Sequence, residues 1–379
     1  ASNNTAVGYQ AGYSNTSSGA NTFVGHQSGY SNTGSNNSAF GYGSLRLNTS
    51  GVFNVAVGLQ SLYSNTTQSN STAVGYQAGY SNTSGGVQAF GYLALRANTT
   101  GIQNHAFGNQ ALDANTTGAF NTAMGGYALS ANTTASNNTA VGYQAAYSNT
   151  TGGNNTSMGF RSLYTNTIGQ YNTALGFAAL QQNIQAYSNT AVGHQALTAN
   201  TTGSGNIGVG ANAIYQNTTG SYNTAIGSGL AGFTVGSLGS NTTGSNNTAV
   251  GHAALQANNT ASNNTAVGYQ SLYANTTGSE LVAVGYKTLD SNTTGARNVA
   301  VGNNALNTVT TGFNNTALGD RSLRVSTGNY NTAVGSDSLY SNTTASNNTA
   351  VGYQAGYSTT TGERNTAMGV QSLYTNTTG

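Results

Sequence analysis

The 379-residue chain contains no cysteine, no proline and no tryptophan, and only 4% of its residues are charged. The absence of cysteine excludes disulfide bonds and thiolate metal sites. Eight basic and six acidic side chains give a net charge of +2, which is too sparse for nucleic-acid binding or for attraction to an anionic membrane. No apolar run approaches the roughly 18 residues that would predict membrane insertion.

A repeat runs through the whole sequence. The phrase S-N-N-T-A-V-G-Y-Q begins at residue 2 and returns at residues 136, 262 and 346. Aligning its glycine gives 22 repeats, mostly 17 residues apart, with the consensus N-T-A-V-G-Y-Q-A-L-Y-S-N-T-T-G-S-N. These letters define positions one to seventeen of the repeat. Low charge with high polarity is typical of disorder, but a period held over so many copies indicates a solenoid or a repeat fibre.

Each column of the repeat accepts a restricted set of side chains. Position four is always apolar and position nine is usually leucine, so we expect these two positions to form a thin core. Position two mixes threonine with valine, which indicates partial burial. Positions seven and ten accept polar and charged residues, including Asp337 at position seven and Asp113 at position ten. We therefore expect positions seven and ten to face water.

The segment T-A-V predicts a short strand with positions two and four on one face and position three on the other. The glycine at position five permits a tight bend, Q-A-L-Y forms a second short segment, and N-T-T-G-S-N is turn material. A helical repeat is disfavoured by its poor helix propensity. We predict an all-β fold, a parallel β-solenoid or β-roll of about 22 coils. Residues 1–379 form a single continuous repeat array, with residues 228–240 as an insertion loop within one coil.

Two phrases resemble a known family of repeats. N-T-A-V-G-Y-Q-A and N-T-A-L-G-F-A-A are similar to the SVAIG-x-x-A-x-A head repeats of trimeric autotransporter adhesins. Residues 265–278 also resemble repeat shafts of phage-tail-fibre-like proteins. The resemblance covers the whole chain and implies a left-handed parallel β-roll in a homotrimeric fibre. The 17-residue period is longer than that of the usual adhesin head.

A single coil cannot fold alone, because two apolar side chains do not offset the entropy lost in ordering 17 residues. We therefore expect self-association, as a lateral trimer, an end-to-end fibre or both. Both ends of the sequence are ordinary repeat, which favours a segment of a longer fibre or end-to-end stacking.

The 24 tyrosines gather at positions six and ten, where stacked coils would align them in columns. Such columns would support lateral packing, or they would form an adhesive surface that binds glycans. The candidate aromatic surface comprises Tyr9, Tyr13, Tyr76, Tyr80, Tyr269 and Tyr273.

The glycosylation acceptor sequence N-x-S/T recurs in the turn column. Asparagine in this column would alternatively provide turn geometry and stacked side-chain hydrogen bonds. Further acceptor sequences lie at Asn3, Asn137, Asn263 and Asn347. The candidate glycosylation sites are Asn15, Asn65, Asn98, Asn132, Asn149, Asn200, Asn217, Asn241, Asn275, Asn292, Asn342 and Asn376.

The sequence contains no recurring arrangement of residues that indicates catalysis. The acidic residues form no recurring pair, and the serines lack a partnered base. The four histidines are spread along the repeat, too far apart to share a metal ion. We therefore expect no catalytic, metal or cofactor-binding residues, no cofactor and no enzyme activity. The histidines are His26, His105, His194 and His252.

Together these features predict a non-enzymatic extracellular structural fibre or filament segment, a surface spacer or coat with adhesive and glycosylated surfaces as candidates. The alternative is a dedicated adhesin, or a phage-like tail-fibre shaft, that recognises host-surface glycans. Ice binding by threonine arrays is a third class, disfavoured because most threonines are expected in turns. We expect the chain to lie outside the cell, or on a cell or virion surface, and to associate with itself and with glycans.

Overall fold

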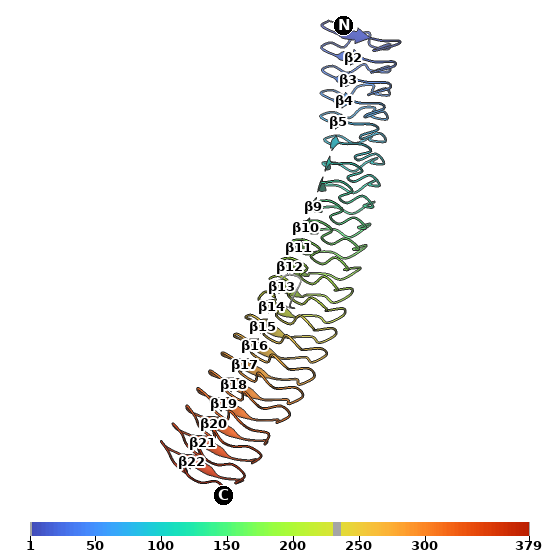
Figure 1. Ribbon diagram of the computed structural model, residues 1–379. Helices are drawn as coiled ribbons and strands as arrows, with labels where there is room; N and C mark the ends of the chain where they lie inside the picture. The colour runs from blue at the N-terminus through green and yellow to red at the C-terminus, as the bar shows by residue number, and fades with distance from the viewer. Residues whose placement is uncertain (1, 230–235, 379) are drawn as a thin grey trace. The chain divides into compact units, whose positions relative to one another are not determined.

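The computed structural model describes residues 2–229 and 236–378. These residues contain 22 strands of three residues each and no helix (Figure 1). The chain divides into two compact units, Ala1–Tyr187 and Ser188–Gly379. In each unit, strands that lie about one repeat apart in the sequence pair in parallel, so the predicted all-β parallel solenoid is confirmed.

Unit 1 contains eleven parallel strands, and each strand pairs with the next in the register set by the repeat. Equivalent positions therefore stack on one another from coil to coil. The strands are β1 (Thr5–Val7), β2 (Thr22–Val24), β3 (Ser38–Phe40), β4 (Val55–Val57), β5 (Thr72–Val74), β6 (Gln88–Phe90), β7 (His105–Phe107), β8 (Thr122–Met124), β9 (Thr139–Val141), β10 (Thr156–Met158) and β11 (Thr173–Leu175).

Unit 2 repeats this arrangement with eleven further strands. They are β12 (Thr190–Val192), β13 (Ile207–Val209), β14 (Thr224–Ile226), β15 (Thr248–Val250), β16 (Thr265–Val267), β17 (Val282–Val284), β18 (Val299–Val301), β19 (Thr316–Leu318), β20 (Thr332–Val334), β21 (Thr349–Val351) and β22 (Thr366–Met368).

Backbone hydrogen bonds between coils continue beyond the strands. In the coil of β9, the amide of Gln144 donates to the carbonyl of Gly126, and the amide of Ala146 donates to the carbonyl of Ser162, both at 2.9 Å. The Q-A-L-Y segment is therefore a run of turns whose amides bond to neighbouring coils as strand amides do. Most of each coil, and not only its strand, holds the stack together.

Each coil turns its corners with left-handed backbone. Gln144 at position seven has φ 56°, Ala146 at position nine has φ 50°, and Asn137 just before position one has φ 62°. At position nine the usual residue is leucine, for which a left-handed conformation costs about 1 kcal/mol. The hydrogen bonds between coils hold these residues in place, so the strain is distributed along the whole stack.

The glycine at position five has φ values that side chains rarely adopt. Gly142 has φ 132°, and a Cβ atom there would lie 2.6 Å from the carbonyl oxygen of Gly159 in the next coil. The predicted tight bend at this position is confirmed. Close approach of successive backbones explains why the column does not vary.

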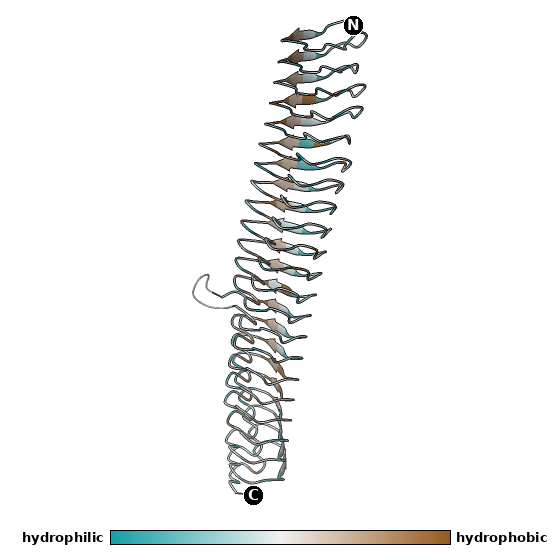
Figure 2. Ribbon diagram, turned by 90° about the vertical axis from the view of Figure 1, so that its right-hand side faces the viewer, coloured by the Kyte–Doolittle hydropathy of each residue, from teal (hydrophilic) through white to brown (hydrophobic). Residues whose placement is uncertain are grey.

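The buried face of each strand is the opposite of the one we predicted. Position three is buried, as at Ala140, and so is the leucine at position nine, as at Leu163, both with 0% exposure. Position four points outward, with Phe107 37% and Met124 46% exposed. The prediction that position four belongs to the core is wrong. In Figure 2 the strands are coloured toward brown, the hydrophobic end of the scale, where the residues at position four lie.

The reason is the volume available inside a coil. Leucine at position nine fills the interior and leaves room for only a methyl group at position three. In β2 position three is Phe23, which is 1% exposed, and position nine is glycine in that coil and the preceding one. A Cβ at Gly12 or Gly29 would lie 2.9 Å or 2.5 Å from the Phe23 ring. The two positions therefore share one packing volume.

Positions seven and ten do not uniformly face water. Asp337 is 4% exposed and Asp113 is 8% exposed, so the prediction for these two residues is wrong. Each carboxylate lies between neighbouring coils beside an arginine, which reduces the cost of burying its charge. Position two is half-buried in most strands, as predicted.

The predicted insertion at residues 228–240 lies between β14 and β15, and its residues 230–235 lie outside the described residues. On either side of them the amides of Gly229 and Gly236 donate to the carbonyls of Ala211 and Asn212. Leu238 is fully buried. The coil of β14 therefore keeps its bonds to the preceding coil at both ends of the insertion.

Candidate functional site

Asparagine at position twelve forms a buried ladder in each unit, which we call the turn ladder. Asn149 is 0% exposed, and its Nδ2 donates to Asn132 Oδ1 and to the carbonyl of Gly152, both at 2.9 Å. Its Oδ1 accepts a 2.8 Å hydrogen bond from Asn166 Nδ2. Each side chain therefore joins three coils and caps the turn of its own coil.

A second ladder is formed by asparagine at position one, which we call the strand-entry ladder. Asn138 Nδ2 donates to the carbonyl of Gly152 at 3.0 Å, and its Oδ1 accepts the backbone amide of Asn155 at 2.9 Å. The side chain replaces a backbone partner where the chain enters the strand. The two ladders satisfy buried polar groups that would otherwise be costly.

The turn ladder contains most of the candidate glycosylation sites. Ten of the twelve candidates are 0% exposed, and the exceptions, Asn15 and Asn376, are half-buried near the chain ends. In the ladder, the Nδ2 atom that a glycan would occupy donates hydrogen bonds instead, as at Asn132 and Asn149, whereas Asn342 Nδ2 is buried without a partner among the described residues. The stacked side-chain hydrogen bonds that we considered as the alternative are present.

A different asparagine column is exposed. The residue just before position one has a left-handed φ and lies at the outer corner of each coil. We call the column formed by this residue in successive coils the corner column. Its members in other coils include Ala20, Phe53, Glu280 and Arg297, so the column tolerates side chains of any kind. Nine coils have asparagine there, and eight of these are exposed while Asn314 is half-buried. The corner asparagines are Asn3, Asn36, Asn70, Asn137, Asn154, Asn246, Asn263, Asn314 and Asn347.

From the sequence we predicted the turn column as the main set of candidates and named only four of these nine asparagines, Asn3, Asn137, Asn263 and Asn347, as further acceptor sequences. The acceptor sequence gives both columns equal weight, because N-x-S/T does not reveal which asparagine points inward. The register of the repeat relative to the stack supplies that information, and only the structure shows it.

The aromatic columns form as predicted. The ring of Tyr13 stacks on Tyr30, and that of Tyr80 stacks on Tyr63, with centroids 5.1 Å apart in both pairs. Five of the six candidate tyrosines are exposed, and Tyr80 is half-buried. Stacking turns each ring face toward the next coil, so the hydroxyl groups and ring edges meet solvent. A sugar that stacks on an aromatic face finds few free faces here.

The other candidate tyrosines follow the same pattern, with one exception. Tyr9 stacks on His26 at 5.1 Å, Tyr76 on Tyr92 at 5.3 Å, and Tyr269 on both His252 and Tyr286. Tyr273 is 37% exposed and is not among the stacked rings. Arg46 lies 5.6 Å from the ring centres of both Tyr30 and Tyr63, so a cation takes the place of an aromatic ring in that column.

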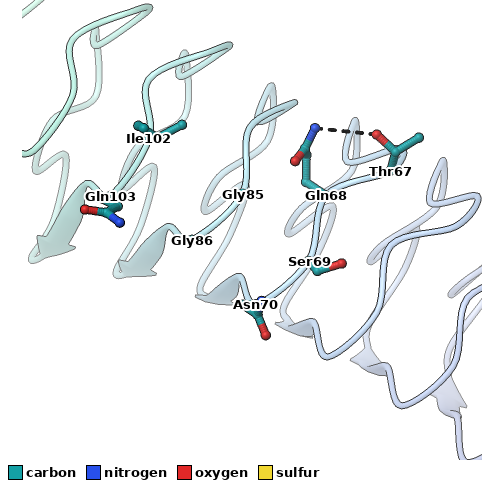
Figure 3. Close-up of a pocket in the computed structure, with 8 residues that line it drawn as sticks. All are labelled: Thr67, Gln68, Ser69, Asn70, Gly85, Gly86, Ile102 and Gln103. Carbon is teal, nitrogen blue, oxygen red and sulfur yellow. Dashed lines mark hydrogen bonds between the residues drawn. The ribbon is translucent and has the colours of Figure 1, made fainter.

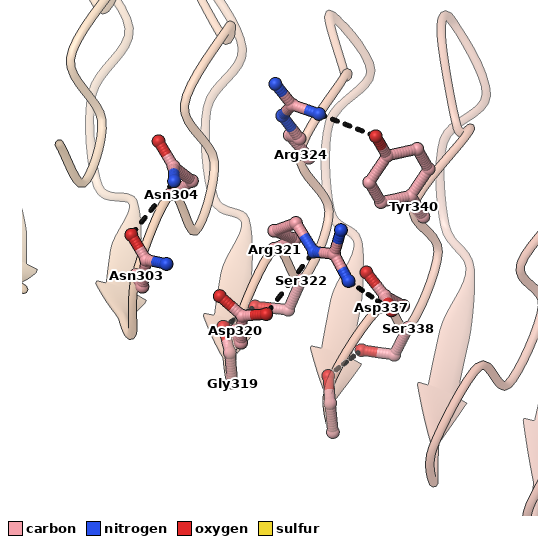
Figure 4. Close-up of polar contacts among 11 residues, drawn as sticks. Asn303, Asn304, Gly319, Asp320, Arg321, Ser322, Arg324, Asp337, Ser338 and Tyr340 are labelled. Atoms are coloured by element: carbon pink, nitrogen blue, oxygen red, sulfur yellow. Dashed lines mark hydrogen bonds and ion pairs between the residues drawn. The ribbon is translucent and has the colours of Figure 1, made fainter. Parts of the chain in front are cut away.

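Several of the few charged side chains pair with one another, mostly across neighbouring coils. Arg321 contacts Asp337 at 2.9 Å and Asp320 at 3.3 Å, and Arg324 donates to the hydroxyl of Tyr340 at 2.6 Å (Figure 4). Asp337 raises the pKa of the Arg321 guanidinium. Such groups neutralise one another between coils and form no acid–base pair of the kind that catalysis requires.

Asp113 forms a similar pair in unit 1, where Arg96 lies 2.9 Å from its carboxylate. Burial raises the pKa of the Asp113 carboxyl, and the attraction of Arg96 opposes this. The charge is therefore tolerated between the coils because its partner lies one coil away.

A surface hollow of about 440 Å³ opens in unit 1 where two glycines occupy the turn (Figure 3). Its lining carries no charged side chain, and Gln68 Nε2 is bonded to Thr67 Oγ1 at 3.4 Å. Within the described residues there is no group of three metal-ligating side chains and no helix able to cross a membrane. The hollow is lined by Thr67, Gln68, Ser69, Asn70, Gly85, Gly86, Ile102 and Gln103.

Comparison with protein-family models and with curated protein sequences gives no match. The resemblance to adhesin head repeats and tail-fibre shafts therefore stays a prediction, and the function is argued from the surfaces described above.

Proposed function

We propose that the chain is a non-enzymatic structural fibre or filament segment, a spacer or coat component outside the cell or on a cell or virion surface. One observation carries this proposal: the recurring polar side chains that are buried bond coil to coil. The side-chain amides of Asn149 and Asn138, in the two ladders, form hydrogen bonds with neighbouring coils. A chain built in this way provides length and a regular surface.

Lateral self-association has a candidate surface in the outer face of the strands. In unit 1 all eleven strands present an apolar residue at position four, with Phe107 37% and Met124 46% exposed. Positions two and four of these strands carry no acidic or basic side chain other than His105. The proposed occupant of this face is the equivalent face of a second copy of the chain, because each face carries a continuous row of apolar side chains at position four and the two rows repeat at the same spacing.

The size of this face is sufficient for association. Three-residue strands about 10 Å long, stacked about 4.8 Å apart, give a face of about 500 Å² for the eleven strands of unit 1. Two such faces together approach the ~1,000 Å² expected of a specific interface. A third copy would be accommodated if the faces meet around an axis.

Analytical ultracentrifugation of the full chain tests the assembly. We expect the wild type to sediment as an oligomer, and the double variant Val141→Lys/Met158→Lys to sediment at lower mass because it places charge on the face. Asn137→Lys/Asn154→Lys is the matched control, because basic residues occur naturally in the corner column. A monomeric wild type, or an unchanged face variant, would refute lateral association.

Electron microscopy of the same material tests the structural role. Regular fibres or elongated particles are expected, and compact globular particles would contradict the proposal. Glycan recognition remains the second candidate because interior tyrosines at position six are exposed, with Tyr143 46% and Tyr269 44% exposed. A glycan array probed with the full chain would support that role by binding and remove it by giving no signal.

A further inference from the structure

The corner asparagines have free side-chain amides. Among the described residues, none of the nine makes a side-chain hydrogen bond, and their left-handed φ values of 55–62° direct the chain outward at the corner. In Figure 3 the side chain of Asn70 projects from the turn. These amides are accessible, in contrast to those of the turn ladder.

Asparagine at the corner depends on the residue two positions later. All nine corner asparagines are followed at position two by threonine or serine, which completes N-x-S/T. Six coils have another residue at position two, and none of these has asparagine at the corner. A left-handed φ favours asparagine wherever it occurs, so backbone conformation alone does not explain this dependence.

The turn ladder behaves in the opposite way. Asn32, Asn166 and Asn183 keep asparagine at position twelve, although glycine, isoleucine and glutamine two residues later break the acceptor sequence. All three are 0% exposed. In the ladder, asparagine is retained for its hydrogen bonds, whereas at the corner it occurs only as part of the tripeptide.

We propose that the corner asparagines are acceptor sites for N-linked glycans and that the turn ladder is not glycosylated. The reaction joins Nδ2 of the corner asparagine to the anomeric carbon of a sugar supplied as a lipid-linked oligosaccharide. The bond from that carbon to the lipid diphosphate breaks, the amide loses one proton, and the lipid diphosphate leaves. An oligosaccharyltransferase is the implied partner.

The position of these sites suits a sugar coat. The corner column lies on the surface of every coil, so glycans there leave both asparagine ladders intact. A chain in which only 4% of the residues are charged has little charge to keep its surface hydrated, and attached sugars would provide a hydrated layer. This inference rests on the proposed location outside the cell in one respect only, because the chain would meet the transferase on its way there. Whether the corner asparagines accept glycans can be tested without knowing that location.

The test uses the folded full chain, an oligosaccharyltransferase and a lipid-linked oligosaccharide, with an unstructured N-N-T peptide in the same tube as the positive control. Peptide mass spectrometry then measures occupancy at each asparagine. We expect glycans at Asn137, Asn263 and Asn347 and none at Asn132, Asn149 and Asn275. Thr139→Val should abolish glycan occupancy at Asn137. Valine at position 139 is compatible with the fold because Val55 and Val282 occupy the same column.

The matched control is Thr151→Val, which breaks the acceptor sequence of Asn149 and should change no occupancy. The proposal is overturned if the peptide is glycosylated while the corner asparagines are not, or if the turn ladder is modified. Intact mass of the chain from its natural source distinguishes the two proposals. If the natural chain has the mass of its polypeptide alone while its corner sites accept glycans in the tube, the proposed location is contradicted and the proposed acceptor sites are retained.

Discussion

Two asparagines twelve residues apart in this repeat have different tasks. Asn149 in the turn ladder is fully buried with its amide bonded to two acceptors, while Asn137 at the corner is exposed. Burial of a polar side chain is favourable only when its hydrogen bonds are made. The same side chain therefore bonds neighbouring coils together in one column, whereas among the described residues of the other it makes no such bond.

Replacing Asn149 by alanine should destabilise unit 1 by about 2–4 kcal/mol, because Asn132 Oδ1, Asn166 Nδ2 and the Gly152 carbonyl each lose a partner. Chemical denaturation followed by circular dichroism measures the change. Asn137→Gln is the matched control and should cost less than about 0.5 kcal/mol, since Gln103 occupies that column elsewhere. Equal effects of the two substitutions would show that the ladder contributes nothing.

At the scale of one coil, the fold depends on backbones that approach closely at the glycine of position five. A strand of three residues is too short to be stable by itself, and it persists because the turns on both sides bond to the neighbouring coils. Gly142, Gln144 and Ala146 all have positive φ values. The strand and its turns therefore form one unit.

Substituting alanine for Gly142 should disrupt the stack at β9 and lower the free energy of unfolding by more than about 3 kcal/mol, because φ is 132° and the added Cβ meets the Gly159 carbonyl at 2.6 Å. Thermal unfolding monitored by circular dichroism reports the loss. Gly126→Ala in the preceding coil should change stability little, since its Cβ would meet only the Tyr143 ring at 3.5 Å. Similar melting temperatures for both variants would refute the close-approach argument.

The period, the parallel pairing and the bend at position five could be predicted from the sequence, because each depends on spacing or on glycine. The buried face could not. T-A-V alternates in either phase, and the apolar residue at position four is larger than the alanine at position three. The structure shows that alanine points inward because leucine at position nine, such as Leu163, fills most of the coil interior. Where position three is the larger Phe23, position nine is glycine instead.

The left-handed backbone conformation of the leucines at position nine could also not be predicted from the sequence. Leucine rarely adopts positive φ, yet Leu112, Leu163 and Leu289 do so at 50–52° because the neighbouring coils fix their backbone. The same lack of information affected the candidate sites. Which asparagine column points outward depends on these corners, and the acceptor sequence alone does not distinguish the two columns.

At the scale of the whole molecule, stability is shared between neighbouring coils. Equivalent positions pair throughout each unit, as Thr139 pairs with Thr156. Since consecutive coils such as those of β8, β9 and β10 pair in the same register, one of them can be removed without creating a new kind of interface. The number of residues removed then matters more than their identity.

Deleting residues 138–154, one full repeat, should leave a folded chain with an unchanged shape of the circular dichroism spectrum. Every ladder is restored across the junction, because Asn155 takes the place of Asn138. Deleting residues 138–145, about half of a repeat, should unfold or aggregate the region because strand, glycine and asparagine columns lose their register. Equal tolerance of both deletions would exclude a fixed coil length.

X-ray diffraction from aligned samples of the full chain tests the central claim most directly, that each repeat closes one coil and bonds to the next through its backbone. The predicted result is a sharp reflection at about 4.8 Å, the spacing of hydrogen-bonded strands. A diffuse ring without that reflection, or the 5.4 Å pitch of an α-helix, would contradict it.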